Sequence, residues 1–234
     1  MSIADKTVLI TGASRGIGQA LTDEALRRGA GRVFAAARRP AAHPDERVTP
    51  LRMDVTDAAQ IRAAAERVGS LDVLVNNAGL ALFEGLGDRA TLERHLAVNL
   101  FGTFAVTEAF LPQLTSSRGA IVNNLSLNSL APLPALAAYS VSKAAAFSLT
   151  QSLRTSLAER GVRVHAVLTG PTDTDMVRGL DIPKASAESV ARAIFDAVDR
   201  GEEDIFPDPL AQALADGWRN GAVKAFERQL AQVR

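Results

Sequence analysis

Short apolar runs alternate along the chain with longer stretches in which apolar residues recur at helical spacing. The runs predict buried parallel strands, and the longer stretches predict helices. We expect strands at residues 7–11, 32–36, 49–53, 71–75, 120–124, 162–168 and, as a short edge strand, 204–206. We expect helices at about 16–28, 57–68, 91–114, 135–160 and 186–200, then a mostly helical tail over 208–233 with candidate breaks near Gly217 and Gly221. This alternation predicts a single α/β domain over residues 1–234, a doubly wound parallel sheet of about seven strands with helices on both faces.

A glycine-rich turn joins the first predicted strand, Thr7–Thr11, to the first predicted helix. Glycines let the backbone approach a pyrophosphate, and a helix N-terminus offers unpaired N–H groups and the positive end of its dipole. The spacing is Gly-x-x-x-Gly-x-Gly, which differs from the commoner Gly-x-Gly-x-x-Gly fingerprint, and a plain tight turn is the alternative. Contacts with a dinucleotide are expected from Gly12, Ser14, Arg15, Gly16, Ile17 and Gly18.

Two arginines, Arg38 and Arg39, follow the second predicted strand. Enzymes that select NAD usually hold a carboxylate near this point for the ribose 2′-OH, whereas an arginine accommodates a 2′-phosphate. Here Ala37 precedes the two arginines, and Arg15 adds a third cation from the glycine turn. A solvated basic loop is the alternative. The position at a strand end favours NADP(H) as the cofactor.

Small and polar residues also follow the next two predicted strands. Asp54 and Val55 follow the strand at 49–53, and the strand at 71–75 runs into Asn76, Asn77, Ala78 and Gly79. A cofactor crevice at the carboxyl edge of a sheet needs small and amide residues, so we expect the four residues at 76–79 to bind cofactor. A simple turn is the alternative for the four residues at 76–79.

Tyr139 and Lys143 lie four residues apart in a stretch, 135–160, that contains no Gly or Pro. On a helix, this spacing places both side chains on one face. A nearby ammonium favours the phenolate and lowers the tyrosine pKa from its usual ~10 towards the range of general acid–base chemistry. Taken alone, Tyr and Lys at this spacing usually form a solvated surface pair.

Asn99 falls in the middle of the helix expected at 91–114. An asparagine there is usually a surface residue. If it is buried, its amide needs partners and can hold a water or distort the helix.

Composition removes several classes of protein from consideration. The 234 residues contain no cysteine, which excludes disulfides and thiolate metal sites, and three scattered histidines leave little for a metal cluster. Lys+Arg and Asp+Glu both number 26, so neither nucleic acid nor a membrane surface is an expected partner. The N-terminus lacks the apolar core of a signal peptide, and no apolar run could cross a bilayer. We therefore expect a cytoplasmic protein.

Together these motifs resemble the short-chain dehydrogenase/reductase family, in its compact single-domain branch, whose fold is of the Rossmann type. The resemblance spans about residues 5–175, and the thirteen-residue gap from Ser126 to Tyr139 fits the family pattern. The motifs occur in the family's order: Thr11-Gly-x-x-x-Gly16-x-Gly18, Asp54, Asn76-Asn-Ala-Gly79, Asn99, Ser126, Tyr139-x-x-x-Lys143 and the segment ending at Thr174. The concordance argues strongly against a surface pair for Tyr139 and Lys143.

The resemblance implies a role for each of these residues. Tyr139 exchanges a proton with the substrate oxygen, Ser126 hydrogen-bonds that oxygen, and Lys143 lowers the tyrosine pKa and binds the nicotinamide ribose. Asn99 holds a water that links Lys143 to solvent. Further cofactor contacts are the adenine amino group with Asp54 and Val55, and the nicotinamide carboxamide and phosphate with Thr172 and Thr174. Two departures from the family are Thr169-Gly170 in place of Pro-Gly and Leu127 in place of a second serine, and neither removes a reacting group.

The function this implies is NADPH-dependent reduction of a ketone or aldehyde, reversible as oxidation of the matching secondary alcohol. We expect the substrate site to be lined by apolar residues, with no cation among them that could bind a carboxylate, so the expected substrate is a hydrophobic small molecule. These residues are Leu80, Ala81, Leu82, Phe83, Leu127, Leu133, Leu136 and Met176. Small residues on the Tyr139 helix, at 144–146, 148 and 152, predict a homodimer or homotetramer packed through this helix and the preceding one.

Two other classes of function compete with this one. The first is a dinucleotide-binding sensor or scaffold without turnover, against which the intact Asn99, Ser126, Tyr139 and Lys143 argue. The second is a sugar-nucleotide epimerase or dehydratase of the extended branch. That branch uses Gly-x-x-Gly-x-x-Gly and a larger C-terminal substrate domain, and the sequence shows neither.

Overall fold

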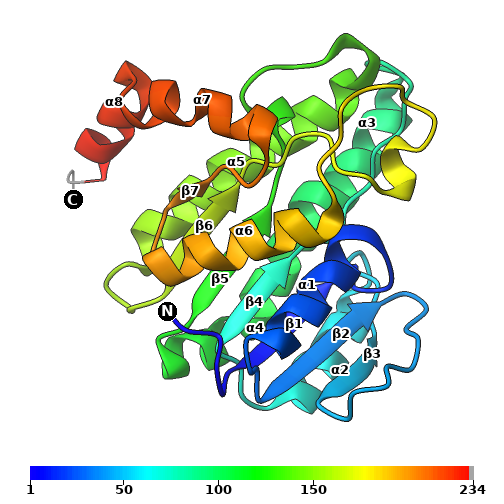
Figure 1. The fold of residues 1–234 in the computed structure, drawn as a ribbon, viewed down its shortest axis with the longest axis vertical. Coiled ribbons are helices and arrows are strands. Elements are labelled where there is room, and N and C mark those ends of the chain that lie inside the picture. Colours follow the sequence, from blue (N-terminus) through cyan, green and yellow to red (C-terminus); the bar gives the residue numbers. More distant parts are fainter. Residues whose placement is uncertain (232–234) are drawn as a thin grey trace.

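One parallel sheet runs through the centre of the computed structural model, which describes residues 1–231 (Figure 1). Within the described residues it has seven strands in the order β3-β2-β1-β4-β5-β6-β7. The strands are β1 (Thr7–Thr11), β2 (Arg32–Ala37), β3 (Val48–Arg52), β4 (Val73–Asn76), β5 (Ala120–Asn124), β6 (Arg163–Val167) and β7 (Asp204–Ile205). The predicted fold class and strand positions are therefore confirmed, with strand boundaries shifted by at most two residues.

Helices cover both faces of this sheet (Figure 1). On one face α1 (Gly16–Arg27) packs against α6 (Ala187–Arg200), and α2 (Ala58–Val68), α4 (Thr103–Ser117) and α5 (Ala137–Leu157) cover the other. Strand side chains supply a buried apolar layer to each helix layer, and Ile10 and Leu9, neighbours in β1, belong to opposite layers. This alternation explains why β1 is apolar throughout.

The chain reverses its winding between β1 and β4. It proceeds outward from β1 through β2 to β3, then returns to the other side of β1 and continues outward to β7. In sheets of this kind a crevice opens at the reversal, beside the carboxyl ends of the strands. The loops that follow β1, β4 and β5 meet there.

The helix predicted at 91–114 is the main correction to the fold. The chain instead forms α3 (Arg89–Leu96), a π-helical segment η1 (Ala97–Gly102) and then α4. Asn99 lies in η1, buried, and its side chain bonds to the backbone of Leu80. The distortion foreseen for a buried asparagine is therefore present, and apolar periodicity could not locate it.

The C-terminal tail forms α7 (Pro209–Arg219) and α8 (Ala222–Leu230), which extend beyond β7 away from the sheet (Figure 1). The break lies at Asn220 and Gly221, as predicted for Gly221, whereas Gly217 lies inside α7. The last predicted tail residues, 232 and 233, lie outside the described residues. Among the helices that the structure describes, none is long and apolar enough to cross a membrane.

Candidate active site

Helix α5 places Tyr139 and Lys143 at the crevice, and both side chains are buried. The residues are 7% and 5% exposed, which excludes the solvated surface pair. Lys143 Nζ lies 5.7 Å from the centroid of the Tyr139 ring and donates a 2.8 Å hydrogen bond to the Asn124 carbonyl at the end of β5. A cation and a phenol therefore share one desolvated site, which a purely structural role does not require.

The pKa values of the pair differ from the expectation based on sequence. Burial raises the pKa of Tyr139 to about 12, and a hydrogen bond with the Ser126 hydroxyl acts in the opposite direction. Burial also lowers the pKa of Lys143 to about 8. In the protein alone the pKa of Tyr139 is therefore raised, and not lowered as expected, because burial disfavours the phenolate. At neutral pH the site holds a neutral phenol beside an ammonium.

Replacing Lys143 by Met is expected to stabilise the fold at pH 7, because the ammonium is buried without a carboxylate partner among the described residues. Burial lowers its pKa from the ordinary 10.5 to about 8 in the folded protein, so the unfolded chain binds more protons between these two pH values. Stability therefore rises with pH through that window. We expect Lys143→Met to raise the free energy of unfolding by about 1 to 3 kcal/mol at pH 7 and by less at pH 10.

The control for this experiment is Lys224, a second buried lysine, which sits 2.7 Å from Asp204. Burial lowers the pKa of Lys224, but the hydrogen bond and the negative charge of Asp204 raise it by more. The pKa of Lys224 is therefore above its ordinary value. Lys224→Met should therefore destabilise, by about 1 to 3 kcal/mol, because it removes one of the two cations that pair with the buried Asp204, whose other cation is Arg154 at 2.7 Å. Urea unfolding at both pH values measures the two changes, and destabilisation by Lys143→Met at pH 7 would contradict this account.

Ser126 and Asn99 both adjoin this pair. Ser126 follows β5 and caps the short 3₁₀ turn Leu127–Ser129, and its hydroxyl bonds with Tyr139. Asn99 Nδ2 donates to Ser142 Oγ at 2.9 Å, and Ser142 in turn donates to the Tyr139 carbonyl. A Cβ added to Gly79 would lie 3.4 Å from Asn99 Oδ1 and 3.7 Å from Lys143 Nζ. All four predicted catalytic residues therefore come together at one site, while the water role of Asn99 stays a prediction.

The glycine turn fits the pyrophosphate of a dinucleotide. Gly12 has φ +67°, and a Cβ there would lie 2.9 Å from the Ala78 Cα. No side chain caps the N-terminus of α1, which begins at Gly16. Its first N–H groups therefore face the crevice unused by the helix. A Cβ on Gly16 would meet Thr174 Cγ2 at 3.0 Å. The segment that carries Thr172 and Thr174 therefore covers the glycine turn, which also contains Ser14 and leads to Ile17.

The two asparagines at the end of β4 make different side-chain contacts. Asn77 Oδ1 accepts from Asn124 Nδ2 at 2.9 Å, while Asn77 Nδ2 donates to the Thr11 carbonyl at 2.9 Å. Asn76 is buried, and its Nδ2 donates to Thr107 and Asn123. The Asn76 amide therefore joins β4 to α4 and β5 beneath the crevice, and the cofactor contact expected for this residue stays a prediction.

Asn124 belongs to the site, although sequence reasoning passed over it. Its carbonyl holds Lys143, its Nδ2 holds Asn77, and its Oδ1 accepts from Thr169 Oγ1 at 2.7 Å. The backbone and side chain of this one residue thus join Lys143, Asn77 and the loop after β6. The sequence feature that could have identified Asn124 is its position at the carboxyl end of a strand, as for Asn77 just after β4.

The three arginines predicted to bind the 2′-phosphate differ in whether they have a carboxylate partner. Arg38 and Arg39 are exposed at the end of β2, and no residue in the described part of the chain pairs with either. Arg15 is instead 2.7 Å from Asp175, so its charge is already matched. Asp54 Oδ1 accepts from the Thr56 amide and hydroxyl, which fixes this carboxylate beside Val55.

The loop after β6 is tied to the C-terminal helices. Asp208 caps α7 by accepting from the Ala211 amide at 3.0 Å, and its other oxygen accepts from the Gly170 amide at 2.7 Å. Asp208 is buried. Helix α7 therefore helps to fix the loop that leads to Thr172 and Thr174.

Comparison with known proteins agrees with this geometry. Residues 6–184 match the family model described as short chain dehydrogenase. The chain belongs to the short-chain dehydrogenase/reductase family. It is 37% identical over 208 residues to 2-(S)-hydroxypropyl-CoM dehydrogenase 3 of Xanthobacter autotrophicus, with 82% of each chain covered. It is 35% identical over 205 residues to sorbitol dehydrogenase of Cereibacter sphaeroides, covering 82% of this chain and 80% of the relative.

A solved member of the family has nearly the same fold. A short chain dehydrogenase from Burkholderia cenocepacia, determined in complex with NADP, is 35% identical, with a TM-score of 0.88 over 97% of this chain and 99% of that one. The predicted membership and the Rossmann-type fold are confirmed, and the protein is an oxidoreductase of this family.

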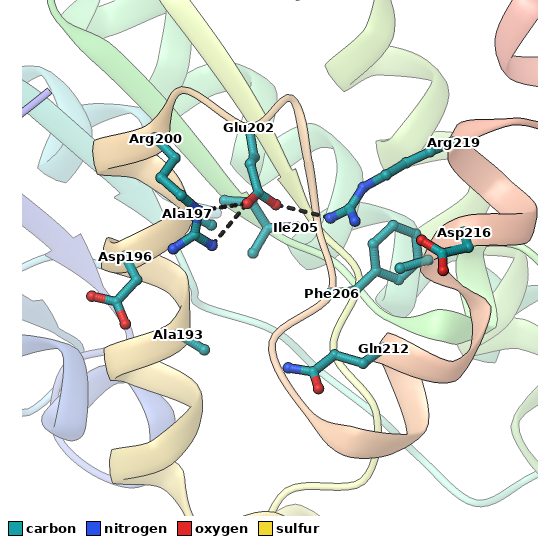
Figure 2. A pocket seen from close by; sticks show the side chains of 11 residues that line it. Ala193, Asp196, Ala197, Arg200, Glu202, Ile205, Phe206, Gln212, Asp216 and Arg219 are labelled. Carbon is teal, nitrogen blue, oxygen red and sulfur yellow. Dashed lines mark hydrogen bonds and ion pairs between the residues drawn. The ribbon is translucent and has the colours of Figure 1, made fainter.

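A hollow of about 370 Å³ between α6, β7 and α7 is separate from this site (Figure 2). Glu202 lies in it between Arg200, at 2.7 Å, and Arg219, at 2.9 Å. Its cations are thus matched within the protein, and none of the predicted catalytic or cofactor residues lines it. We assign no function to it.

Proposed function

We propose that the protein is an NADPH-dependent reductase of hydrophobic ketones or aldehydes, reversible as a secondary-alcohol dehydrogenase. The observation that carries this proposal is the buried Tyr139, with the Ser126 hydroxyl and the Lys143 ammonium at the same crevice. Family membership supports the reaction class.

The nicotinamide, when bound, supplies the hydride for the carbonyl carbon. Tyr139 donates its phenolic proton to the substrate oxygen, on which negative charge develops, and Ser126 donates a second hydrogen bond to that oxygen. Lys143 is charged at neutral pH, since its pKa is about 8, and its ammonium stabilises the phenolate that remains. In the reverse direction Tyr139 accepts the alcohol proton.

Cofactor binding is assigned to the glycine turn and the strand ends around it. The turn and the N-terminus of α1 hold the pyrophosphate, and Lys143 holds the nicotinamide ribose. Arg38 and Arg39 bind the 2′-phosphate through charge-assisted bonds, because both are free of carboxylate partners in the described part of the chain.

The substrate class follows from the apolar residues that border the crevice. Phe83, Leu133 and Met176 are 45%, 46% and 43% exposed, which is unusual for large apolar side chains unless they meet a ligand or partner. Leu136 is buried instead, so it supports this wall from beneath. The relatives' names cover alcohols as different as sorbitol and a CoM thioether. The hydrophobic class therefore rests on this chain's own residues.

The test is NADPH consumption by the purified protein across a panel of apolar, sugar and carboxylate-bearing carbonyl compounds. We expect turnover to concentrate in the apolar ketones and aldehydes. NADPH binding without consumption of any panel member would favour the sensor or scaffold instead. A preference for sugars or acids would refute the substrate class alone.

We also expect a homodimer or homotetramer. Exposed Ala144, Ser148 and Ser152 leave one face of α5 smooth, and Phe101 and Phe104 are 61% and 44% exposed on the neighbouring η1 and α4. Ala146, which sequence reasoning placed on this face, packs in the chain's own core. Light scattering at micromolar concentration should give two or four times 24.7 kDa, and Phe101→Asp with Phe104→Asp should give monomer. A monomeric wild type would contradict this proposal.

A further inference from the structure

His95 is a fully buried histidine on α3, 0% exposed, with both ring nitrogens occupied. Nδ1 lies 2.8 Å from the Thr91 carbonyl, and Nε2 lies 3.1 Å from the Leu82 amide nitrogen. An amide can only donate and a carbonyl can only accept. The proton therefore resides on Nδ1, and the Nε2 lone pair accepts from Leu82.

The same ring also contacts the proposed proton donor. The His95 and Tyr139 ring centroids are 6.4 Å apart, at an interplanar angle of 69°. This is the edge-to-face arrangement that aromatic rings favour. His95 thus touches both the Tyr139 ring and the backbone of a residue expected to line the substrate.

Leu82 belongs to the segment Gly79–Gly85, which leaves β4 and crosses the crevice. Asn99 holds the start of this segment, accepting from the Leu80 amide at 2.8 Å and donating to its carbonyl at 2.9 Å. The far end is held by Gly85, whose amide donates to Ala135 and whose carbonyl accepts from Ala138 beside Tyr139. Between these anchors, the Leu82 amide donates its hydrogen bond to His95 Nε2.

We propose that His95 is a positioning residue that fixes the Leu82 wall of the substrate site against Tyr139. This inference rests on the proposed reductase function. On this proposal His95 affects the affinity for the carbonyl substrate through its hydrogen bond with Leu82. His95 itself does not touch the reacting atoms. Without an acceptor at Nε2, the partly buried Leu82 amide loses its partner and the segment shifts to satisfy it.

The experiment compares His95→Phe, which keeps a ring beside Tyr139 but removes the acceptor, with His95→Gln, whose side-chain oxygen can accept from Leu82. We expect His95→Phe to raise KM for the carbonyl substrate at least about fivefold, with kcat and KM for NADPH within about twofold of wild type. His95→Gln should restore KM to within about twofold of wild type. The matched control is His165→Phe, another buried histidine whose Nδ1 faces a carbonyl, that of Glu202. It should leave the carbonyl KM unchanged.

Two readouts do not depend on turnover. Amide exchange at Leu82 should be slow in wild type and in His95→Gln, and faster in His95→Phe. In wild type labelled with ¹⁵N-histidine, His95 should show a protonated Nδ1 and an unprotonated Nε2. Unchanged KM and unchanged Leu82 exchange in His95→Phe, or a protonated Nε2 in wild type, would overturn the proposal. Absence of carbonyl turnover in wild type with these two readouts as expected would refute the reductase function and the substrate role, while keeping His95 as the anchor of Leu82.

Discussion

Replacing Tyr139 by Phe is expected to lower kcat for carbonyl reduction at least about a hundredfold while NADPH affinity stays within about threefold. The substitution removes the proton donor but keeps the ring that packs edge-on against His95. The contacts assigned to the cofactor, in the glycine turn and at Lys143, are untouched. Single-turnover reduction and NADPH fluorescence titration measure the two quantities separately.

Ser126→Ala is the matched control for this substitution. It removes a hydroxyl that bonds with Tyr139 but leaves the proton donor in place, so turnover should fall less than in Tyr139→Phe. Cofactor affinity should again change little. Substantial reductase activity in Tyr139→Phe would refute the assignment of this residue.

The pH dependence of the reverse reaction follows from the same residue. Alcohol oxidation needs the phenolate, so its rate should rise with pH. Burial raises the Tyr139 pKa to about 12 in the protein alone, and the positive charge of an oxidised nicotinamide should lower it. Tyr139 is the only tyrosine in the chain, so ultraviolet absorbance can follow its ionisation in the free protein and in the NADP⁺ complex. Equal midpoints in the two states would discredit the stabilisation of the phenolate by nearby cations.

The second large effect concerns cofactor choice. We expect wild type to prefer NADPH over NADH at least about tenfold in kcat/KM, about 1.4 kcal/mol, and Arg38→Asp to abolish or reverse this preference. Arg38 has no carboxylate partner in the described part of the chain. An aspartate there would repel the 2′-phosphate and could accept from a ribose 2′-OH.

Arg32→Asp controls for the change in net charge. Arg32 is exposed at the opposite end of β2, where its guanidinium lies 5.3 Å from the centroid of the Phe34 ring. The preference for NADPH should survive this substitution. Arg15→Ala should reduce it less than Arg38→Asp, because Arg15 is held by Asp175. Equal use of NADH and NADPH by wild type would sink this assignment of Arg38.

Sequence reasoning predicted most of the fold because its signals are local. The apolar run at Thr7–Thr11 and the breaks at glycines mark elements directly, and Asp57 caps α2 where its position predicted a helix start. Motif order then predicted which side chains meet at the carboxyl edge. The π-helical segment around Asn99 could not be predicted, since it depends on hydrogen bonds with Leu80, nineteen residues away.

The errors at the site have the same cause, because burial and long-range partners are tertiary properties. Asn76 and Asn77 are identical in type and adjacent, yet one is bonded inside the core and the other faces the glycine turn. The pKa of Tyr139 is raised, and not lowered as expected, because the folded chain buries the phenol. His95 gave no signal in the sequence, since its partners Leu82 and Tyr139 come together only in the folded chain.

The most direct test of the central claim, that this site reduces a carbonyl with hydride from NADPH and a proton from Tyr139, is isotope transfer. NADPH deuterated at C4 of the nicotinamide, on each face in turn, is incubated with the wild-type protein and the best apolar ketone of the panel. The account predicts one deuterium on the carbinol carbon of the alcohol from one of the two labelled cofactors, and almost none with Tyr139→Phe. Bound NADPH that delivers no deuterium to any carbonyl substrate would contradict it.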